Sequence, residues 1–219
     1  MPVDFAFRIA PRLLATRPLD ELELVDDAVL SGTDYGAVPG GVGAVADLAE
    51  IEECRFSGTS LSGAVLRKLT ISDTEFSACD LAVLAAEESG WTRVTVADSR
   101  VSGLHLSGAT LQYVGFERSQ AADSLWRFAK LKRVRFTECS LTGADFTGCS
   151  FEEVEFVDCD LTGVSFSQAR VKGLRLRNCS FARVTGLTAL RGATIVLADP
   201  LAGLDLLGPM AADLGIRLE

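Results

Sequence analysis

The chain has 219 residues, 48% of them hydrophobic, and its 30 acidic and 21 basic residues give a formal net charge of −9. This apolar content excludes an intrinsically disordered chain, and the acidic balance argues against direct nucleic-acid binding, which needs a basic surface. The longest apolar run, Leu81–Ala86, is far too short to span a membrane.

The N-terminus does not read as a signal peptide, because Asp4, Arg8 and Arg12 interrupt its apolar residues. We therefore expect a cytoplasmic protein. Further along residues 1–50, Val25, Leu30 and Tyr35 follow a five-residue step that is one residue out of register with the pattern beyond them. Pro39-Gly40-Gly41 then interrupts the step. We expect residues 1–50 to form an N-terminal segment with a degenerate first coil and a one-residue insertion.

A strict five-residue repeat occupies the region from Ile51 to Phe181. Every fifth residue is apolar at all 27 positions, and only Ala86 and Ala121 are as small as alanine. At the background apolar fraction, chance would give this in one chosen register with a probability of roughly a few in 10⁹. Neither a helix nor a plain alternating strand produces a period of five. We call these positions the central residues.

The position two residues before each central residue is mostly small, and all six cysteines fall there: Cys54, Cys79, Cys139, Cys149, Cys159 and Cys179. We expect these thiols to fill the core, with Cys139, Cys159 and Cys179 stacked in one column. A soft-metal or redox role is the minor alternative, since the chain has no Cys-x-x-Cys and one histidine. Ser-Gly and Thr-Gly pairs recur after the central residue, where the chain must turn.

A longer period of twenty lies over the repeat, so that blocks such as VRFTEC (134–139) and VEFVDC (154–159) recur. Four five-residue sides per coil is the simplest geometry, with coils one strand spacing of about 4.8 Å apart. TGADF (142–146) and CDLTG (159–163) resemble the pentapeptide-repeat family, over at least residues 51–183. The resemblance implies an all-β solenoid: a right-handed quadrilateral parallel β-helix.

The last segment, residues 184–219, should hold a final partial coil and a short C-terminal helical cap. Asp199-Pro200 suits a helix start, Gly208-Pro209 a break between two short helices, and Gly215 an end. One face of these helices would carry Leu201, Leu204, Leu207, Ala211 and Leu214. This face covers the last coil, or pairs two chains as in family members that dimerise through C-terminal elements; one segment could do both.

Charges are distributed unevenly: residues 1–50 carry −6, residues 51–183 carry −1 and residues 184–219 carry −2. Within the repeat, opposite charges recur twenty apart, which predicts ion-pair ladders between coils. The expected ladders are Arg135, Glu155, Arg175; Lys132, Glu152, Lys172; Arg55, Glu75; and Arg118, Glu138. A cation–π stack is expected among Arg93, Tyr113 and Arg133.

One outward column is unusually apolar and is the candidate interaction patch: Val65, Ala85, His105, Leu125, with Phe128 across the same corner. A local irregularity near Ala121 and Trp126 is the competing explanation. No nucleophile–base pair, metal set or phosphate loop is expected, so we predict no catalytic, cofactor or metal residues. The match of Gly41-x-Gly43-x-x-Ala46 to a dinucleotide fingerprint lacks a βαβ context.

The resemblance implies a non-enzymatic binding protein, and two functions stay open. The topoisomerase-interacting branch of the family includes fluoroquinolone-resistance proteins that mimic DNA and protect gyrase or topoisomerase IV. An acidic rod with a C-terminal pairing element fits that branch, although the repeat itself is nearly neutral. The alternative is a protein–protein interaction scaffold with another partner and no topoisomerase role.

Overall fold

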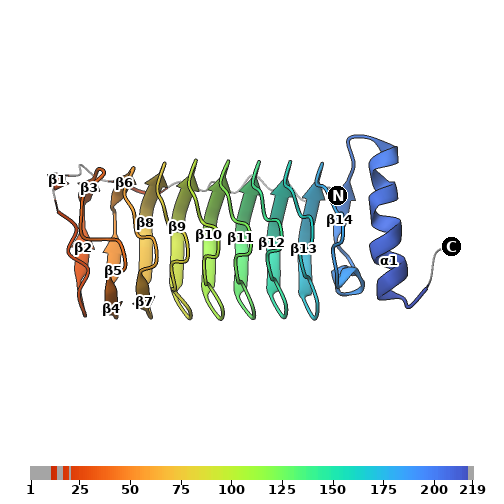
Figure 1. Ribbon diagram of the computed structural model, residues 1–219, viewed down its shortest axis with the longest axis horizontal. Coiled ribbons are helices and arrows are strands. Elements are labelled where there is room, and N and C mark those ends of the chain that lie inside the picture. The colour runs from red at the N-terminus through yellow and green to blue at the C-terminus, as the bar shows by residue number, and fades with distance from the viewer. Residues whose placement is uncertain (1–10, 14–16, 20, 217–219) are drawn as a thin grey trace.

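The computed structural model describes residues 11–13, 17–19 and 21–216, and shows a parallel β-solenoid with a short C-terminal helix (Figure 1). The predicted all-β solenoid class is therefore confirmed. The strands are β1 (Arg17–Leu19), β2 (Val29–Ser31), β3 (Thr33–Tyr35), β4 (Val45–Asp47), β5 (Glu50–Glu52), β6 (Arg55–Ser57), β7 (Val65–Arg67), β8 (Thr70–Ser77), β9 (Gly90–Ala97), β10 (Thr110–Glu117), β11 (Lys130–Thr137), β12 (Ser150–Val157), β13 (Arg170–Arg177) and β14 (Thr194–Val196). The helices are two 3₁₀ segments, η1 (Leu187–Leu190) and η2 (Pro200–Leu206), and α1 (Leu207–Asp213).

Each coil has four sides, and consecutive coils from β4 to β13 are in register at twenty residues, whereas β13 pairs with β14 at nineteen. From β8 to β13 one eight-residue strand makes two sides, and single β-bridges such as Gln120↔Ser140 and Leu125↔Asp145 join the other two sides. The residue two places after each of the 27 central residues has a left-handed backbone, with φ between 45° and 75°. These residues are the corners of the coil. Only eight of them are glycine, so most corners carry a side chain outward.

The inward columns form one continuous core. All central residues are buried except Val171, which is partly buried because β14 pairs only with the second half of β13. Phenyl rings in one column stack at the coil spacing, as between Phe116 and Phe136 (5.0 Å) and between Phe136 and Phe156 (4.7 Å). The two small central residues, Ala86 and Ala121, each precede a buried Trp in the next side, which conserves core volume.

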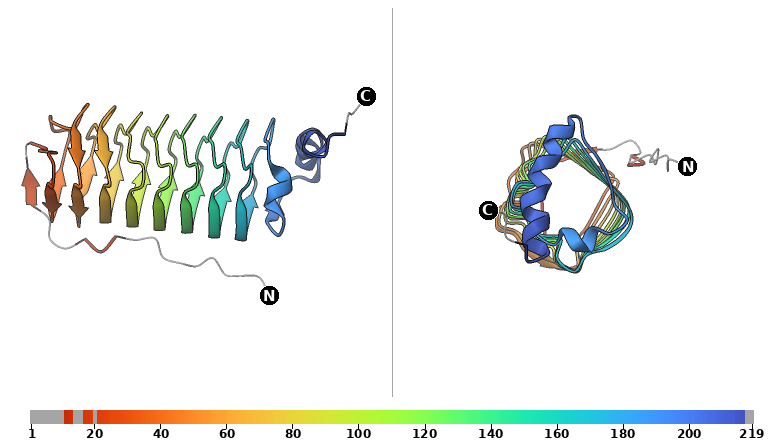
Figure 2. Two further views of the ribbon diagram at one scale, coloured as in Figure 1. Left: turned by 90° about the horizontal axis from the view of Figure 1, so that it is seen from below. Right: turned by 90° about the vertical axis from the view of Figure 1, so that its right-hand side faces the viewer.

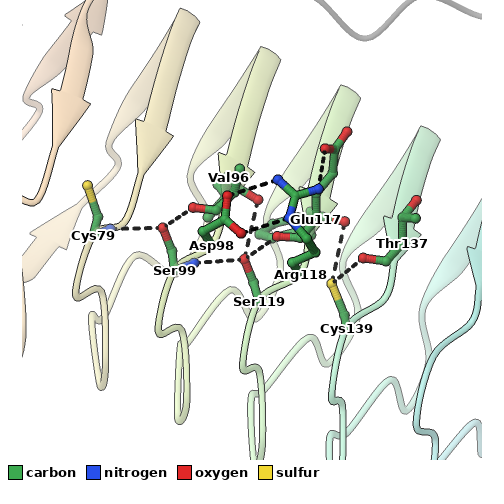
Figure 3. Close-up of polar contacts among 11 residues, drawn as sticks. Cys79, Val96, Asp98, Ser99, Glu117, Arg118, Ser119, Thr137 and Cys139 are labelled. Atoms are coloured by element: carbon green, nitrogen blue, oxygen red, sulfur yellow. Dashed lines mark hydrogen bonds and ion pairs between the residues drawn. The ribbon is translucent and has the colours of Figure 1, made fainter.

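One inward column adds hydrogen-bond donors to the core. It consists of Thr59, Cys79, Ser99, Ser119, Cys139, Cys159 and Cys179. Each side chain donates to a main-chain carbonyl two residues earlier or in the preceding coil, as Cys139 does to Thr137 and Phe116 (both 3.4 Å) (Figure 3). The predicted core position of the thiols is confirmed, since all six cysteines are free and buried. The position has room for a small side chain that donates a hydrogen bond, which explains why it holds only Ser, Thr or Cys.

The first coil contains the predicted insertion. Tyr35 pairs with Phe56, twenty-one residues on, whereas Val45 pairs with Val65, twenty residues on, so the extra residue lies between Tyr35 and Val45. A Cβ on Gly40 would lie 2.0 Å from the carbonyl oxygen of Leu22, and one on Gly41 would lie 2.3 Å from that of Ser60. Gly41 of the apparent dinucleotide fingerprint therefore serves close backbone packing, whereas Gly43 takes a left-handed backbone with φ 64°.

The C-terminal end is closed by helices. α1 lies across the last coil (Figure 2), and Asp213 accepts hydrogen bonds from the backbone N–H groups of Gly186 and Thr188 (both 3.2 Å). η2 ends where α1 begins, with Pro209 in the first turn, where its missing N–H costs nothing. Gly215 ends α1 as predicted, with φ 70°. No helix in the described ranges is long and apolar enough to cross a membrane.

Candidate interaction surface

The apolar column predicted from the sequence is continuous in the structure and one coil longer. Val45 pairs with Val65, and bridges then join Val65 to Ala85, Ala85 to His105 and His105 to Leu125. We call these five residues the apolar stripe; at the coil spacing it is about 19 Å long. The backbone there keeps its register through Asp145.

Three exposed corner residues widen the apolar stripe. Phe128 (63% exposed) and Leu48 (50%) lie at one corner, and Val83 (58%) lies at the other. The Phe128 ring rests on the Gly148 corner of the next coil, where a Cβ would lie 2.5 Å from it. Val83 is β-branched with φ 55°, a conformation that such residues rarely adopt. Sequence reasoning missed Val45, Leu48 and Val83, although all three precede the predicted patch or border it.

Carboxylates are concentrated in the N-terminal coils of the chain. Residues 21–89 hold 14 Asp and Glu against three Lys and Arg, whereas residues 90–189 hold 10 against 13. Between residues 21 and 54 there are nine carboxylates and no basic residue. We call residues 21–89 the acidic half. Because the stripe begins at Val45, its first three residues, Val45, Val65 and Ala85, belong to the acidic half.

Most charges elsewhere on the rod are paired across coils. Ion pairs join Arg135 to Glu155 (3.1 Å), Arg55 to Glu75 (3.2 Å), and both Lys132 (3.3 Å) and Lys172 (3.5 Å) to Glu152. The predicted ladder of Lys132, Glu152 and Lys172 and the predicted pair of Arg55 and Glu75 are confirmed, as is the Arg135–Glu155 step of the third ladder. The predicted pair between Arg118 and Glu138 is wrong, because Arg118 instead contacts Asp98 of the preceding coil at 2.7 Å (Figure 3).

The outward column of Arg93, Tyr113 and Arg133 is only partly a cation–π stack. The Arg133 guanidinium lies 5.2 Å from the centre of the Tyr113 ring, as expected. Arg93 instead pairs with Asp73 of the preceding coil, and the backbone N–H of Arg12 donates to the same carboxylate at 3.0 Å. The Arg93 hydrogen bonds hold the pKa of Asp73 below its ordinary value, against the effect of burial.

The histidine and the thiols show no arrangement for catalysis or metal binding among the described residues. His105 is half-exposed, with its Nδ1 3.6 Å from a Glu87 carboxylate oxygen. Burial raises the pKa of the Cys149 thiol to about 12, which leaves it protonated and unreactive at neutral pH. Within the described part of the chain, no group of three or more His, Cys, Asp and Glu residues could hold a metal ion.

The predicted helical face is divided between burial and exposure. Ala211 is buried, whereas Leu204, Leu207 and Leu214 are exposed, and the side chain of Leu201 lies outside the described residues. A hollow of about 340 Å³ separates α1 from the last coil. It is lined by Leu187, Thr188, Leu190, Arg191, Ala193, Ile195, Leu206, Met210 and Leu214. The segment therefore covers the solenoid end and still presents an apolar surface.

Two family models match the sequence within the solenoid. The model for pentapeptide repeats (8 copies) matches residues 48–81, and the model for the pentapeptide repeat region matches residues 129–187. The chain is a pentapeptide-repeat protein. No curated protein matches the sequence of this pentapeptide-repeat protein.

Solved structures similar to this pentapeptide-repeat protein are distant in sequence. HetL, a pentapeptide repeat protein involved in heterocyst differentiation regulation from the cyanobacterium Nostoc sp. strain PCC 7120, is 17% identical; the match covers 85% of this chain and 86% of HetL, with a TM-score of 0.45. QnrB1, a plasmid-mediated fluoroquinolone resistance protein, is 16% identical; the match covers 89% of this chain and 99% of QnrB1, with a TM-score of 0.36. Rfr23 from the cyanobacterium Cyanothece 51142 is 13% identical over 71% of this chain and 83% of its own, with a TM-score of 0.20.

Proposed function

We propose that this pentapeptide-repeat protein is a non-enzymatic binding protein, and that a protein partner docks on the apolar stripe. The observation that carries the proposal is the unbroken column from Val45 to Leu125, whose first three residues lie in the acidic half. Apolar surface at the centre of a patch with charge at its border is the usual composition of a protein interface. The partner should therefore present an apolar surface bordered by Lys or Arg.

Substitution within one column tests this proposal. Leu125→Asp should abolish capture of the partners that the wild-type protein retains, as measured by quantitative affinity mass spectrometry. Ser165→Asp is the matched control, because Ser165 occupies the same column two coils on, where the outward residues are polar. Equal capture by all three proteins would remove the stripe from the interface.

A type II topoisomerase, either gyrase or topoisomerase IV, is the finer proposal. Such enzymes bind DNA through basic surfaces, and the acidic half offers them a carboxylate-rich rod. Fluoroquinolone resistance, the property in the name of QnrB1, is the corresponding cellular function. The cross-coil ion pairs favour contact through the acidic half over mimicry of DNA along the whole rod.

A supercoiling assay decides between a topoisomerase and another partner. Purified protein should change gyrase supercoiling, or its inhibition by a fluoroquinolone, in a way that Leu125→Asp weakens and Ser165→Asp does not. Unchanged supercoiling with and without the drug would exclude the topoisomerase and leave the general scaffold. The six free thiols suit a reducing cytoplasm, which is where we place this activity.

We also propose that the exposed face of α1 pairs two copies of the chain. Leu207, Met210 and Leu214 support this proposal, since all three are exposed even though Met210 and Leu214 also line the hollow beside the last coil. Leu207→Asp should convert a dimer to a monomer in light scattering, whereas Ala212→Asp on the other side of α1 should not. If the wild-type protein remains a monomer in light scattering at about 100 µM, pairing is excluded.

A further inference from the structure

The two ends of the solenoid are closed differently. At the C-terminal end, η2 and α1 follow β14 and cover the last coil (Figure 1). At the N-terminal end, β1 pairs with β3, but among the described strands only β5 pairs with β2. One edge of β2 therefore has no described strand beside it. Natural sheets usually cover or block such an edge, because its backbone groups can pair with another chain.

The hydrogen bonds between β2 and β5 show which way the N–H groups of Val29 and Ser31 point. The Glu50 N–H donates to the Ala28 carbonyl (2.8 Å), and the Gly32 N–H donates to the Glu52 carbonyl (3.1 Å). In a parallel ladder the residues between these bonded groups turn their own N–H and C=O to the other side. The N–H groups of Val29 and Ser31 therefore point along the rod, away from the next coil. The Ser31 carbonyl accepts the Thr33 hydroxyl at 2.9 Å.

An acidic hollow adjoins this edge. Its volume is about 470 Å³, and it is lined by Glu21, Glu23, Val25, Ala28, Val29, Leu30, Ser31, Thr33 and Tyr35. Val25 and Val29 are more than half exposed, which gives an added strand an apolar surface to pack on. Glu21 and Glu23 are exposed at the rim.

We propose that the edge of β2 that has no described strand beside it accepts an extended segment of a partner protein, in which Lys or Arg alternates with apolar residues, as an additional strand. Main-chain hydrogen bonds to Val29 and Ser31 would give affinity, and the carboxylates and apolar surface of the hollow would select the side chains. A second copy of the same end is disfavoured, because nine carboxylates between residues 21 and 54 would face another nine.

A synthetic peptide tests the site in the full-length chain. The probe is a fluorescent seven-residue peptide in which Val and Lys alternate, measured by fluorescence polarisation, with a version methylated on alternate backbone nitrogens as the control. Wild type should bind the first peptide at least tenfold tighter than the second. Absence of binding at 1 mM peptide, or equal binding of both peptides, would overturn the proposal.

Two substitutions at one residue separate the backbone from the side chain. Val29→Pro removes the N–H that faces the added strand and leaves the β2–β5 ladder intact, since proline is tolerated at such a position. It should weaken peptide binding at least tenfold, while Val29→Thr, which keeps the N–H, should stay within twofold of wild type. Equal binding by Val29→Pro and Val29→Thr would overturn the proposal.

Amide shifts and charge variants give a second readout if Val29→Pro folds poorly. Peptide should shift the NMR amide signals of Val29 and Ser31 in wild type, and the double variant Glu21→Gln, Glu23→Gln should bind at least fivefold more weakly with a smaller salt dependence. Shifts confined to other coils would overturn the proposal. Tenfold tighter binding after deletion of residues 1–10 would also overturn it, by assigning the edge to the chain's own N-terminal residues. Leu125→Asp should leave peptide binding unchanged, because Leu125 lies far from β2 in the sequence of coils. The test of the β2 edge is therefore independent of the test of the apolar stripe.

Discussion

Ser119→Ala should destabilise the solenoid far more than its single lost oxygen suggests. The Ser119 hydroxyl is buried, donates to the Glu117 carbonyl at 2.8 Å and accepts from the Ser99 N–H at 3.2 Å (Figure 3). Alanine would leave the buried Ser99 N–H without this acceptor, and an unsatisfied buried group costs about 1–3 kcal/mol. The Glu117 carbonyl would still accept the Asp98 N–H (3.0 Å). We expect a loss of about 1–3 kcal/mol, and a Tm lower by about 2–12 °C for a chain of this size.

Ser119→Cys is the matched variant, because Cys139 and Cys159 occupy the same column and donate to equivalent carbonyls. It should lose less than about 1 kcal/mol relative to wild type. The assay is denaturant unfolding in a reducing buffer, followed by the fluorescence of Trp91 and Trp126, which lie in the core on either side of Ser119 in sequence. The reasoning would be refuted if Ser119→Ala unfolded within about 0.5 kcal/mol of wild type, or if Ser119→Cys lost as much as Ser119→Ala.

Three further predictions concern the corners, the first coil and acid. Val83→Asn should raise Tm by about 2–4 °C in calorimetry, because Asn tolerates the left-handed corner that strains Val; a lower Tm would contradict this. Gly40→Ala should cost at least about 3 kcal/mol, because φ is +104° and the new Cβ would meet the Leu22 carbonyl, and hydrogen exchange should rise in the first coil only; uniform or unchanged exchange would contradict it. Burial alone would raise the pKa of Asp160, but hydrogen bonds from Ser180, Thr162 and Thr142 outweigh it and lower the pKa to about 2. Its stabilisation is therefore complete above the unfolded pKa of about 4 and lost as the pH falls from 4 to 2, so Asp160→Asn should flatten acid unfolding in that window relative to wild type.

The repeat could be predicted from sequence because a solenoid contacts mainly its neighbouring coils, so one column of side chains reports one line in space. The inward positions of Phe136 and Cys159 follow directly from that column. The donor role of the Ser99 and Ser119 column does not, because Ser, Cys and Ala satisfy a small-residue pattern equally well. Only the backbone path shows which carbonyls need a partner.

The candidate surface was predictable in its centre and not at its borders. The residues from Val65 to Leu125 recur at twenty residues. Val45 lies just before the regular pattern, and the small Ala46 that follows it makes the repeat hard to recognise there. Leu48 and Val83 lie at corners, which every residue type can occupy in this chain. The pairing of β1 with β3 joins residues sixteen apart, so no twenty-residue period predicts it.

Because the coils repeat at twenty residues, the length of the rod can change without any change in the edge of β2 at one end or in the helical cap at the other. Each coil adds one strand spacing of about 4.8 Å and contacts only the coil on either side. Duplicating one internal coil would move the open edge of β2 and the helical cap apart by that increment without altering either. The number of coils therefore sets the distance between the edge of β2 and the helical cap.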